Sequence, residues 1–287
     1  MRKSLVALVA LAGAAAPAAR AQCRPGPNSN EARLLAFYSV PIAFSALDAP
    51  NRQSAWHLEL QAELSPVPTA DPSIEHASEC YAASAQQHSR LTSVFARPRV
   101  LLTLPLGLAI EASYIPPIQV GDAKPHLGSA AISETMALHG FGPFGSSALM
   151  LRADGTIGHV RGPITCPRSA LQQSEPDSAC YGNNPSDDKF TPTMAGLEAV
   201  YGVKSRGERF ALFAGTGVAW LRPRFEVGFT SLDGLTDNTQ VEVNLKRWSV
   251  LGGATLRLPA NFALTTEVYS VPKDVTTWRF AASYRLH

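Results

Sequence analysis

The sequence predicts an all-β protein, an antiparallel up-and-down transmembrane β-barrel of about ten strands, with twelve strands as the alternative. Three observations predict this fold class. About ten segments alternate apolar and polar residues with the two-residue period of a strand. These segments follow an export leader, and most of them are joined by tight turns. Strands that cross a membrane have to close into a barrel, because lipid cannot satisfy a free sheet edge.

The leader is expected at residues 1–21, as a cleaved signal peptide. A short basic and apolar stretch ends at Ala19-Arg20-Ala21, which offers small residues for cleavage. Lipidation of Cys23 is not expected, because Gln22 stands where a lipoprotein signal needs a small residue. The chain has 25 Lys and Arg against 23 Asp and Glu, and three of the basic residues lie in the leader. The mature chain is therefore nearly neutral, and nucleic acid is not an expected partner.

Residues 22–53 are expected to be an N-terminal segment, a possible helix or plug, ahead of a barrel at 54–287. Ser29 before Leu34 and Leu35 is typical of a helix start, whereas the stretch from Tyr38 to Phe44 alternates like a strand. An eleventh strand would break the even number of strands found in single-chain bacterial barrels.

The first barrel strand is predicted at 54–65, where one face is apolar from Trp56 to Leu64 and the other is polar from His57 to Glu63. Long connections rich in Pro, Ser and Asn alternate with short turns, as in membrane barrels. The next strands are predicted at about 96–104, 107–119, 127–139, 147–161 and 190–203.

A long hairpin is predicted between residues 208 and 258. Its apolar residues change from even-numbered to odd-numbered positions near Pro223, and change back near Lys246. Both changes lie at equal distances from a turn at Asp233-Gly234. A bulge on both arms of a hairpin that projects beyond the membrane would explain the two changes. Trp220 and Trp248 would then lie at the same height.

All four cysteines follow the leader, so two disulfides are expected in an oxidising compartment, with three pairings possible. A bridge between Cys166 and Cys180 is favoured because the two residues bracket one Pro- and Ser-rich stretch. Cys23 and Cys80 then pair by elimination, which requires the N-terminal segment to pass through the lumen. No cysteine spacing indicates a metal, and neither a metal nor a cofactor is expected.

The inward face of the strands carries acids and arginines in balance. These side chains either neutralise one another in a packed polar lumen or line a narrow passage or ligand pocket. The predicted lumen-lining residues are His57, Glu59, Glu63, Arg99, Glu111, Arg152, Asp154, Glu198, Arg209, Arg257, Glu267, Arg279 and Arg285.

Aromatic residues at outward positions are predicted to form a girdle at the membrane interfaces. The girdle residues are Trp56, Tyr114, Trp220, Trp248, Trp278 and Tyr284. Among the loops, 162–189 is the candidate for recognition, because its cysteines would hold it rigid.

No catalytic motif is present, and the protein is not predicted to be an enzyme. His57 near Glu59 and His126 near Ser129 are expected to be chance neighbours among seven histidines. Residues 140–145 match Gly-x-Gly-x-x-Gly but contain Pro143, and no helix is predicted after them, so they are expected to form a turn.

The last strand, from Trp278 to Leu286, resembles the closing strand of bacterial outer-membrane β-barrel proteins, although the chain ends in His287 rather than in an aromatic residue. With the leader and the turn lengths, this resemblance covers residues 54–287. It implies an outer-membrane location, lipid as a neighbour, insertion by the barrel assembly machinery, periplasmic turns and surface loops.

Three functions fit such a chain. The first is a structural or surface-interaction barrel with a filled polar lumen. The second is a narrow channel or transporter for small polar or apolar solutes, and the third is a barrel-embedded lipid-modifying enzyme. No motif in the sequence decides among them.

Overall fold

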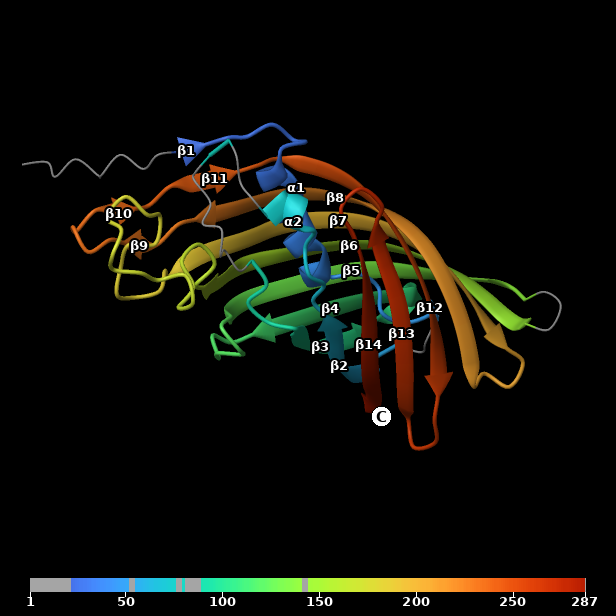
Figure 1. The fold of residues 1–287 in the computed structure, drawn as a ribbon. Coiled ribbons are helices and arrows are strands. Elements are labelled where there is room, and N and C mark those ends of the chain that lie inside the picture. Colours follow the sequence, from blue (N-terminus) through green and yellow to red (C-terminus); the bar gives the residue numbers. More distant parts are fainter. Residues whose placement is uncertain (1–21, 52–54, 76–78, 81–88, 141–143, 287) are drawn as a thin grey trace, which may run out of the picture.

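The computed structural model describes residues 22–51, 55–75, 79–80, 89–140 and 144–286, so the predicted signal peptide lies outside the described part. Its strands confirm the predicted fold class, because ten of them pair in an antiparallel ring that closes between β7 and β8 (Figure 1). The strands of the ring are β2 (Leu58–Pro66), β3 (Val94–Thr103), β4 (Leu108–Ile115), β5 (Lys124–His139), β6 (Phe144–Gly162), β7 (Asp188–Ser205), β8 (Phe210–Glu226), β12 (Leu245–Arg257), β13 (Phe262–Val271) and β14 (Val275–Leu286).

The remaining elements are short and lie outside the ring or inside its lumen. Ser29 caps the first helix, since its hydroxyl accepts a hydrogen bond from the Ala32 amide at 3.1 Å. Within the described residues, no helix is long and apolar enough to cross a membrane. These elements are β1 (Gln22–Cys23), α1 (Asn30–Ser39), the 3-10 helix Val40–Ile42, α2 (Pro72–Glu75), the 3-10 helix Pro105–Gly107, β9 (Phe229–Thr230), β10 (Thr236–Asp237) and β11 (Gln240–Glu242).

The two ends of the barrel differ in the length of their connections. We call one the turn end, because tight turns such as 104–107 and 258–261 lie there. The other is the loop end, where residues 67–75 and 163–187 lie between strands and β9 and β10 project (Figure 1). This alternation of short and long connections follows the prediction.

The outer face of the barrel is apolar over most of its height. Large side chains such as Leu64, Ile132, Leu197 and Val250 point outward, and about half of the surface of each is exposed. A soluble sheet would bury such a face, and so continuous an apolar belt is typical of a barrel wall that contacts lipid.

The predicted bulges are wrong. β8 pairs with β12 and β11 in one unbroken register, from Leu221 opposite Leu245 to Phe225 opposite Val241. The parity of inward residues therefore never changes at Pro223 or Lys246. What changes is the polarity of the two faces. Toward the loop end, apolar side chains point inward onto α1, and arginines point outward.

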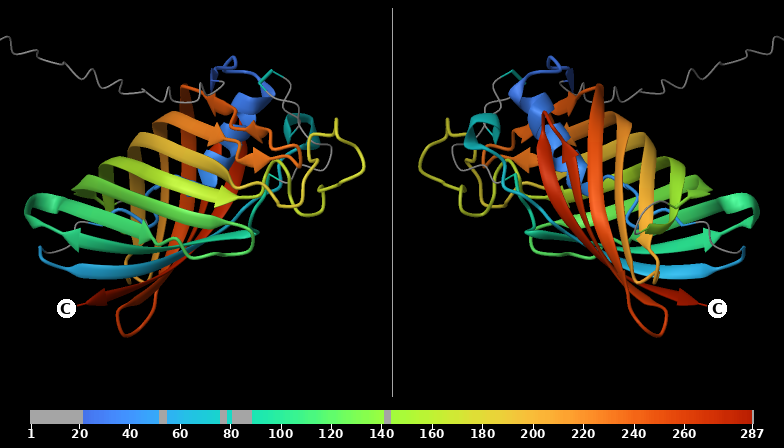
Figure 2. Two further views of the ribbon diagram at one scale, coloured as in Figure 1. Left: turned by 90° about the vertical axis from the view of Figure 1, so that its left-hand side faces the viewer. Right: turned by 90° about the vertical axis from the view of Figure 1, so that its right-hand side faces the viewer.

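The N-terminal segment fills the lumen, as a helix followed by an extended stretch. β1 pairs with β11 at the loop end, α1 packs inside the wall, and residues 40–51 continue toward the turn end, where β2 begins (Figure 2). Disulfides join Cys23 to Cys80 and Cys166 to Cys180, so both expected pairs are present. The first pair fixes the start of the segment that threads the barrel.

Candidate functional site: a two-zone lumen

The half of the lumen nearer the turn end holds four buried arginines, Arg97, Arg99, Arg152 and Arg279, which we call the arginine cluster. Arg99 lies between two carboxylates, with Nε 2.5 Å from Glu111 and Nη1 2.9 Å from Glu63. Further ion pairs join Arg97 to Glu63 at 3.2 Å, Arg152 to Glu111 at 2.7 Å and to Glu198 at 3.6 Å, and Arg279 to Glu267 at 3.5 Å. Each arginine of the cluster therefore has a carboxylate partner, as a low-dielectric interior requires.

The same arginines bind the backbone of residues 40–51, which we call the plug. Arg99 Nη2 donates to the Ser45 carbonyl at 2.7 Å, and Arg97 Nη2 donates to the Ile42 carbonyl at 3.0 Å. Arg152 donates to the Phe44 carbonyl. An extended chain inside a barrel has no ladder partners, and these bonds satisfy its carbonyl groups.

Acidic wall residues beside these arginines also bind the plug. Glu198 accepts a hydrogen bond from the Ala46 amide at 3.0 Å, and Glu267 accepts one from the Ser45 hydroxyl at 2.8 Å. The wall therefore donates hydrogen bonds to carbonyl groups of the plug and accepts hydrogen bonds from its N–H and O–H groups. The charged lumen is thus a binding site for this segment.

Phe44 is the centre of the plug and is fully buried. The guanidinium carbons of Arg99, Arg152 and Arg97 lie 4.3, 4.9 and 5.2 Å from the centre of its ring. Cation–π contacts of this kind are strongest where water is excluded. The Phe44 ring thus fills the space between these guanidinium groups, which carry the same charge and repel one another.

The predicted lumen residues fall into two groups. Those with buried side chains in or beside the cluster are Glu63, Arg99, Glu111, Arg152, Asp154, Glu198, Glu267 and Arg279. Glu59 is buried nearer the turn end, where it pairs with Arg285 at 3.4 Å. His57, Arg257 and Arg285 are partly buried near the turn end, and Arg209 is exposed in a turn outside the strands. The prediction therefore misplaced Arg209, because it began this strand at residue 208, whereas β8 begins at Phe210.

Sequence reasoning missed Arg97 and the role of the plug. Arg97 shares the inward parity of Arg99 on β3, so the alternation could have identified it. Nothing in the sequence of the plug shows that its backbone would be bound by side chains from the wall.

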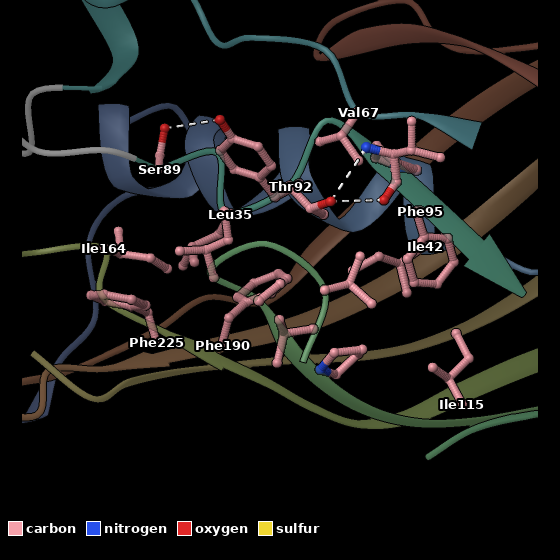
Figure 3. A pocket seen from close by; sticks show the side chains of 18 of the residues that line it. Leu35, Ile42, Val67, Ser89, Thr92, Phe95, Ile115, Ile164, Phe190 and Phe225 are labelled. Atoms are coloured by element: carbon pink, nitrogen blue, oxygen red, sulfur yellow. Dashed lines mark hydrogen bonds between the residues drawn. The ribbon is translucent and has the colours of Figure 1, made fainter. Parts of the chain in front are cut away.

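The half of the lumen nearer the loop end is a pocket of about 280 Å³ with almost entirely apolar walls. Leu35 and Ile42, from α1 and the plug, face Phe190, Phe225 and Ile115 from the wall (Figure 3). This volume is near the lower limit of the roughly 300–1,000 Å³ that is usual for ligand pockets. The change in the positions of the apolar residues near Pro223 and Lys246 reflects this apolar half of the lumen, although we predicted a bulge from it.

Among the described residues, the polar side chains that line this pocket are Glu31, Tyr38, Ser89 and Thr92. The Tyr38 hydroxyl and the Ser89 hydroxyl are 2.8 Å apart, and Ser89 donates to Glu75 (Figure 3). Since Ser89 donates its one hydroxyl hydrogen to Glu75, Tyr38 is the donor to Ser89, and burial raises the pKa of the Tyr38 hydroxyl so that it keeps this hydrogen. The Tyr38 oxygen can then accept a hydrogen bond from a ligand. The site can hold an apolar body and bind one polar atom at its edge.

The possible catalytic pairs considered in the sequence do not form. The Ser129 hydroxyl lies 2.8 Å from the Thr156 hydroxyl, whereas His126 is on the opposite face of β5 against the ring of His159. His57 Nδ1 lies 3.3 Å from the Ala55 carbonyl. Among the described residues, no three His, Cys, Asp or Glu side chains converge as metal ligands.

The six predicted girdle residues have large exposed surfaces, and five of them lie at outward positions of strands. Trp56 is the exception, because it precedes β2 in a turn with a positive φ of 67°. Between β8 and β12, Trp220 is paired with Lys246, and Trp248 is paired with Val218, two positions further along the ladder. The two indoles are therefore diagonal neighbours at nearly the same height.

The loop of 163–187 is held by more than its disulfide. Asp188 accepts hydrogen bonds from the amides of Ile164 and Thr165 at 2.8 and 2.5 Å, and from the Ser186 hydroxyl at 2.8 Å. It also accepts one from the Gly228 amide, which ties this loop to the hairpin of β8 and β12. Such a loop presents a fixed surface.

Comparison with known proteins gives only distant similarities of fold. No protein-family model matches the chain, and no curated protein matches it. The solved structure of Ail, the attachment invasion locus protein of Yersinia pestis, is 10% identical at a TM-score of 0.32, over 81% of this chain and 100% of Ail. The copper transporter OprC is 9% identical at a TM-score of 0.30, over 84% of this chain and 44% of OprC. An OmpT loop-deletion mutant from Vibrio cholerae is 10% identical at a TM-score of 0.23, over 82% of this chain and 77% of OmpT. We draw no functional conclusion from similarities at this level.

Proposed function

We propose that this protein is an outer-membrane barrel that binds a hydrocarbon chain in its loop-end pocket and whose lumen is closed to bulk solute by the plug. The apolar pocket between α1 and the wall carries this proposal. Transfer of hydrocarbon from water into such a pocket is favourable by about 0.8 kcal/mol for each buried methylene group. With turns on the periplasmic side, the pocket lies in the half of the lumen near the cell surface.

The filled lumen supports a binding role over an open channel. Wide aqueous channels take about 16 strands, and this ring also contains a helix and an extended segment. Insertion by the barrel assembly machinery and the absence of enzymatic activity stay predictions.

Photolabelling tests the proposed binding. The mature protein, held in an amphipathic polymer, would be irradiated with a fatty acid that carries a diazirine, and the labelled peptides would be identified by mass spectrometry. We expect labels on Leu35 and Phe190, which line the pocket from α1 and β7.

Ala123→Trp would fill the pocket, because Ala123 is buried in its wall, and should remove these labels. Ala137→Trp is the control, because Ala137 is exposed near the turn end. Labels that are spread over the outer face, or that survive in Ala123→Trp, would contradict the proposal.

Surface recognition by the loop of 163–187 is a second candidate, favoured by its disulfide and by its anchor at Asp188. Cells that display the protein should adhere to a protein-coated surface, and replacement of both Cys166 and Cys180 by Ser should weaken that adhesion. Equal adhesion of a strain that lacks the gene would contradict this role.

A further inference from the structure

The wall of the barrel is not paired along its whole length. β3 pairs with β2 from Val94 to Leu102, but its ladder with β4 runs only from Val100 opposite Ala112 to Thr103 opposite Ala109. β4 itself pairs with β5 along its full length. Toward the loop end, residues 94–99 and 113–115 therefore border a gap in the ladder, which we call the β3–β4 window.

Prolines on both sides help to explain why the ladder stops. Pro98 in β3, and Pro116 and Pro117 directly after β4, have no amide hydrogen to donate, and proline within sheets is confined to edges. The window is closed again at the loop end, where the Asp122 amide donates to the Leu91 carbonyl at 3.1 Å. It is a bounded opening within the wall.

The pocket lies directly behind this window. Phe95 and Ala96 line the pocket from β3, and Ile115 and Ile118 line it from the other border. Ala96 has the outward parity of its strand and is exposed, yet it lines the pocket. The pocket is therefore continuous with the outer surface of the barrel at this point.

The outer surface around the window is apolar. Val100, Ile110 and Tyr114 are exposed on the strands, and Ile118 in the following connection is 64% exposed. Such a border fits hydrocarbon rather than water. It indicates that the window opens toward the membrane.

The depth of the window in the membrane follows from its backbone. On β3, the Ala96 N–H and the Ala96 and Pro98 carbonyl groups face the window without a partner on β4, whereas Val94 bonds the Thr92 hydroxyl through both its N–H and its carbonyl, at 3.4 and 2.9 Å. Such unpaired backbone groups would each cost several kcal/mol in the centre of a bilayer. At the level of lipid esters and head groups, water and lipid oxygens can bind these groups. The window therefore fits the level at which a lipid chain joins its head group.

Basic side chains lie beside the window at this level. Lys124, His126 and His159 point outward near the loop end of β5 and β6, and the His126 ring lies 5.8 Å from that of Tyr114. Arg161, opposite Lys124, is engaged by Asp187 at 2.5 Å. The Lys124 ammonium is placed to attract an anionic head group, and the two imidazoles can donate hydrogen bonds to it.

We propose that the pocket is filled sideways: one hydrocarbon chain of an outer-leaflet lipid with a phosphorylated head group passes through the β3–β4 window into the pocket. The head group stays outside, near Lys124, His126 and His159. This inference rests on the proposed function, since it requires the pocket to bind a hydrocarbon chain, and it adds the source and the route of that chain.

Photolabelling from within a bilayer tests the route. The protein would be placed in nanodiscs that contain a phosphatidylglycerol with a diazirine at the end of one chain, and labelled peptides would be mapped after irradiation. We expect labels on Leu35 and Phe190 inside the pocket. Ala96→Trp, which blocks the window from its border, should reduce them at least tenfold.

Ala62→Trp is the matched control, because Ala62 is outward and exposed on the neighbouring β2 and does not line the pocket. It should leave the labels unchanged. Both variants should keep the boiling-dependent gel shift of a folded barrel. Equal labelling in Ala96→Trp and Ala62→Trp would overturn the route.

A second probe separates failure of the route from failure of the binding. If the free diazirine fatty acid labels Leu35 and Phe190 while the lipid-borne chain labels only the outer face, the pocket binds hydrocarbon but the window does not admit it. If neither probe labels the pocket, both proposals are wrong.

Discussion

Arg99→Met tests whether the arginine cluster holds the plug. Methionine keeps much of the apolar stem but removes the pairs with Glu63 and Glu111 and the bond to the Ser45 carbonyl, at 2.9, 2.5 and 2.7 Å. All three partners stay buried without this donor, and breaking a buried pair in this way costs about 3–5 kcal/mol. At about 2–4 °C for each kcal/mol, the midpoint of thermal unfolding should fall on the order of 10 °C.

The assay is thermal unfolding of the mature protein in detergent, followed by the loss of the gel-shifted folded form. Arg209→Met is the matched control, because Arg209 is an exposed arginine in a turn and should change the stability by less than about 0.5 kcal/mol. Similar midpoints for Arg99→Met and Arg209→Met would refute the structural role of the cluster.

Three further changes probe the plug, its tether and a turn. Phe44→Ala should cost about 3–5 kcal/mol, measured by the same unfolding assay, because it removes the ring between three guanidinium groups; an unchanged midpoint would contradict the packing. Replacing Cys23 and Cys80 by Ser should make the N-terminal segment sensitive to protease at the loop end, because nothing covalent would then hold its start, and equal digestion of both proteins would argue against the tether. Gly107→Ala should lower the midpoint, since Gly107 has a φ of 86° and a Cβ would meet the Thr135 carbonyl; a midpoint within about 1 °C of the parent would count against that strain.

The sequence is sufficient to predict the ring of strands, but it does not predict the pocket inside the ring. Strict alternation from Trp56 to Leu64 and in the C-terminal strands determines which face meets lipid, because the period of a strand is two. The pocket could not be predicted in this way. Phe95, Phe190 and Phe225 come from three strands, and only the closed register brings them to one side of α1.

The wrong bulges show the same limit. Apolar residues move to the inward positions beyond Trp220 because the inner face of the wall packs on α1 there, while the backbone register is constant. The positions of apolar residues in a sequence depend on what each face of the strand contacts, and they do not reveal the backbone geometry of the strand. The prolines that border the window were also visible in the sequence, but their position on facing strands depends on the fold.

Ion conductance in planar bilayers tests most directly the central claim that the N-terminal segment closes this barrel. The mature protein should be silent, and a variant that lacks residues 22–51 but keeps the boiling-dependent gel shift should give stepwise currents, because the lumen then loses α1 and the plug. Steady currents from the intact protein, or silence from the folded deletion variant, would contradict the account.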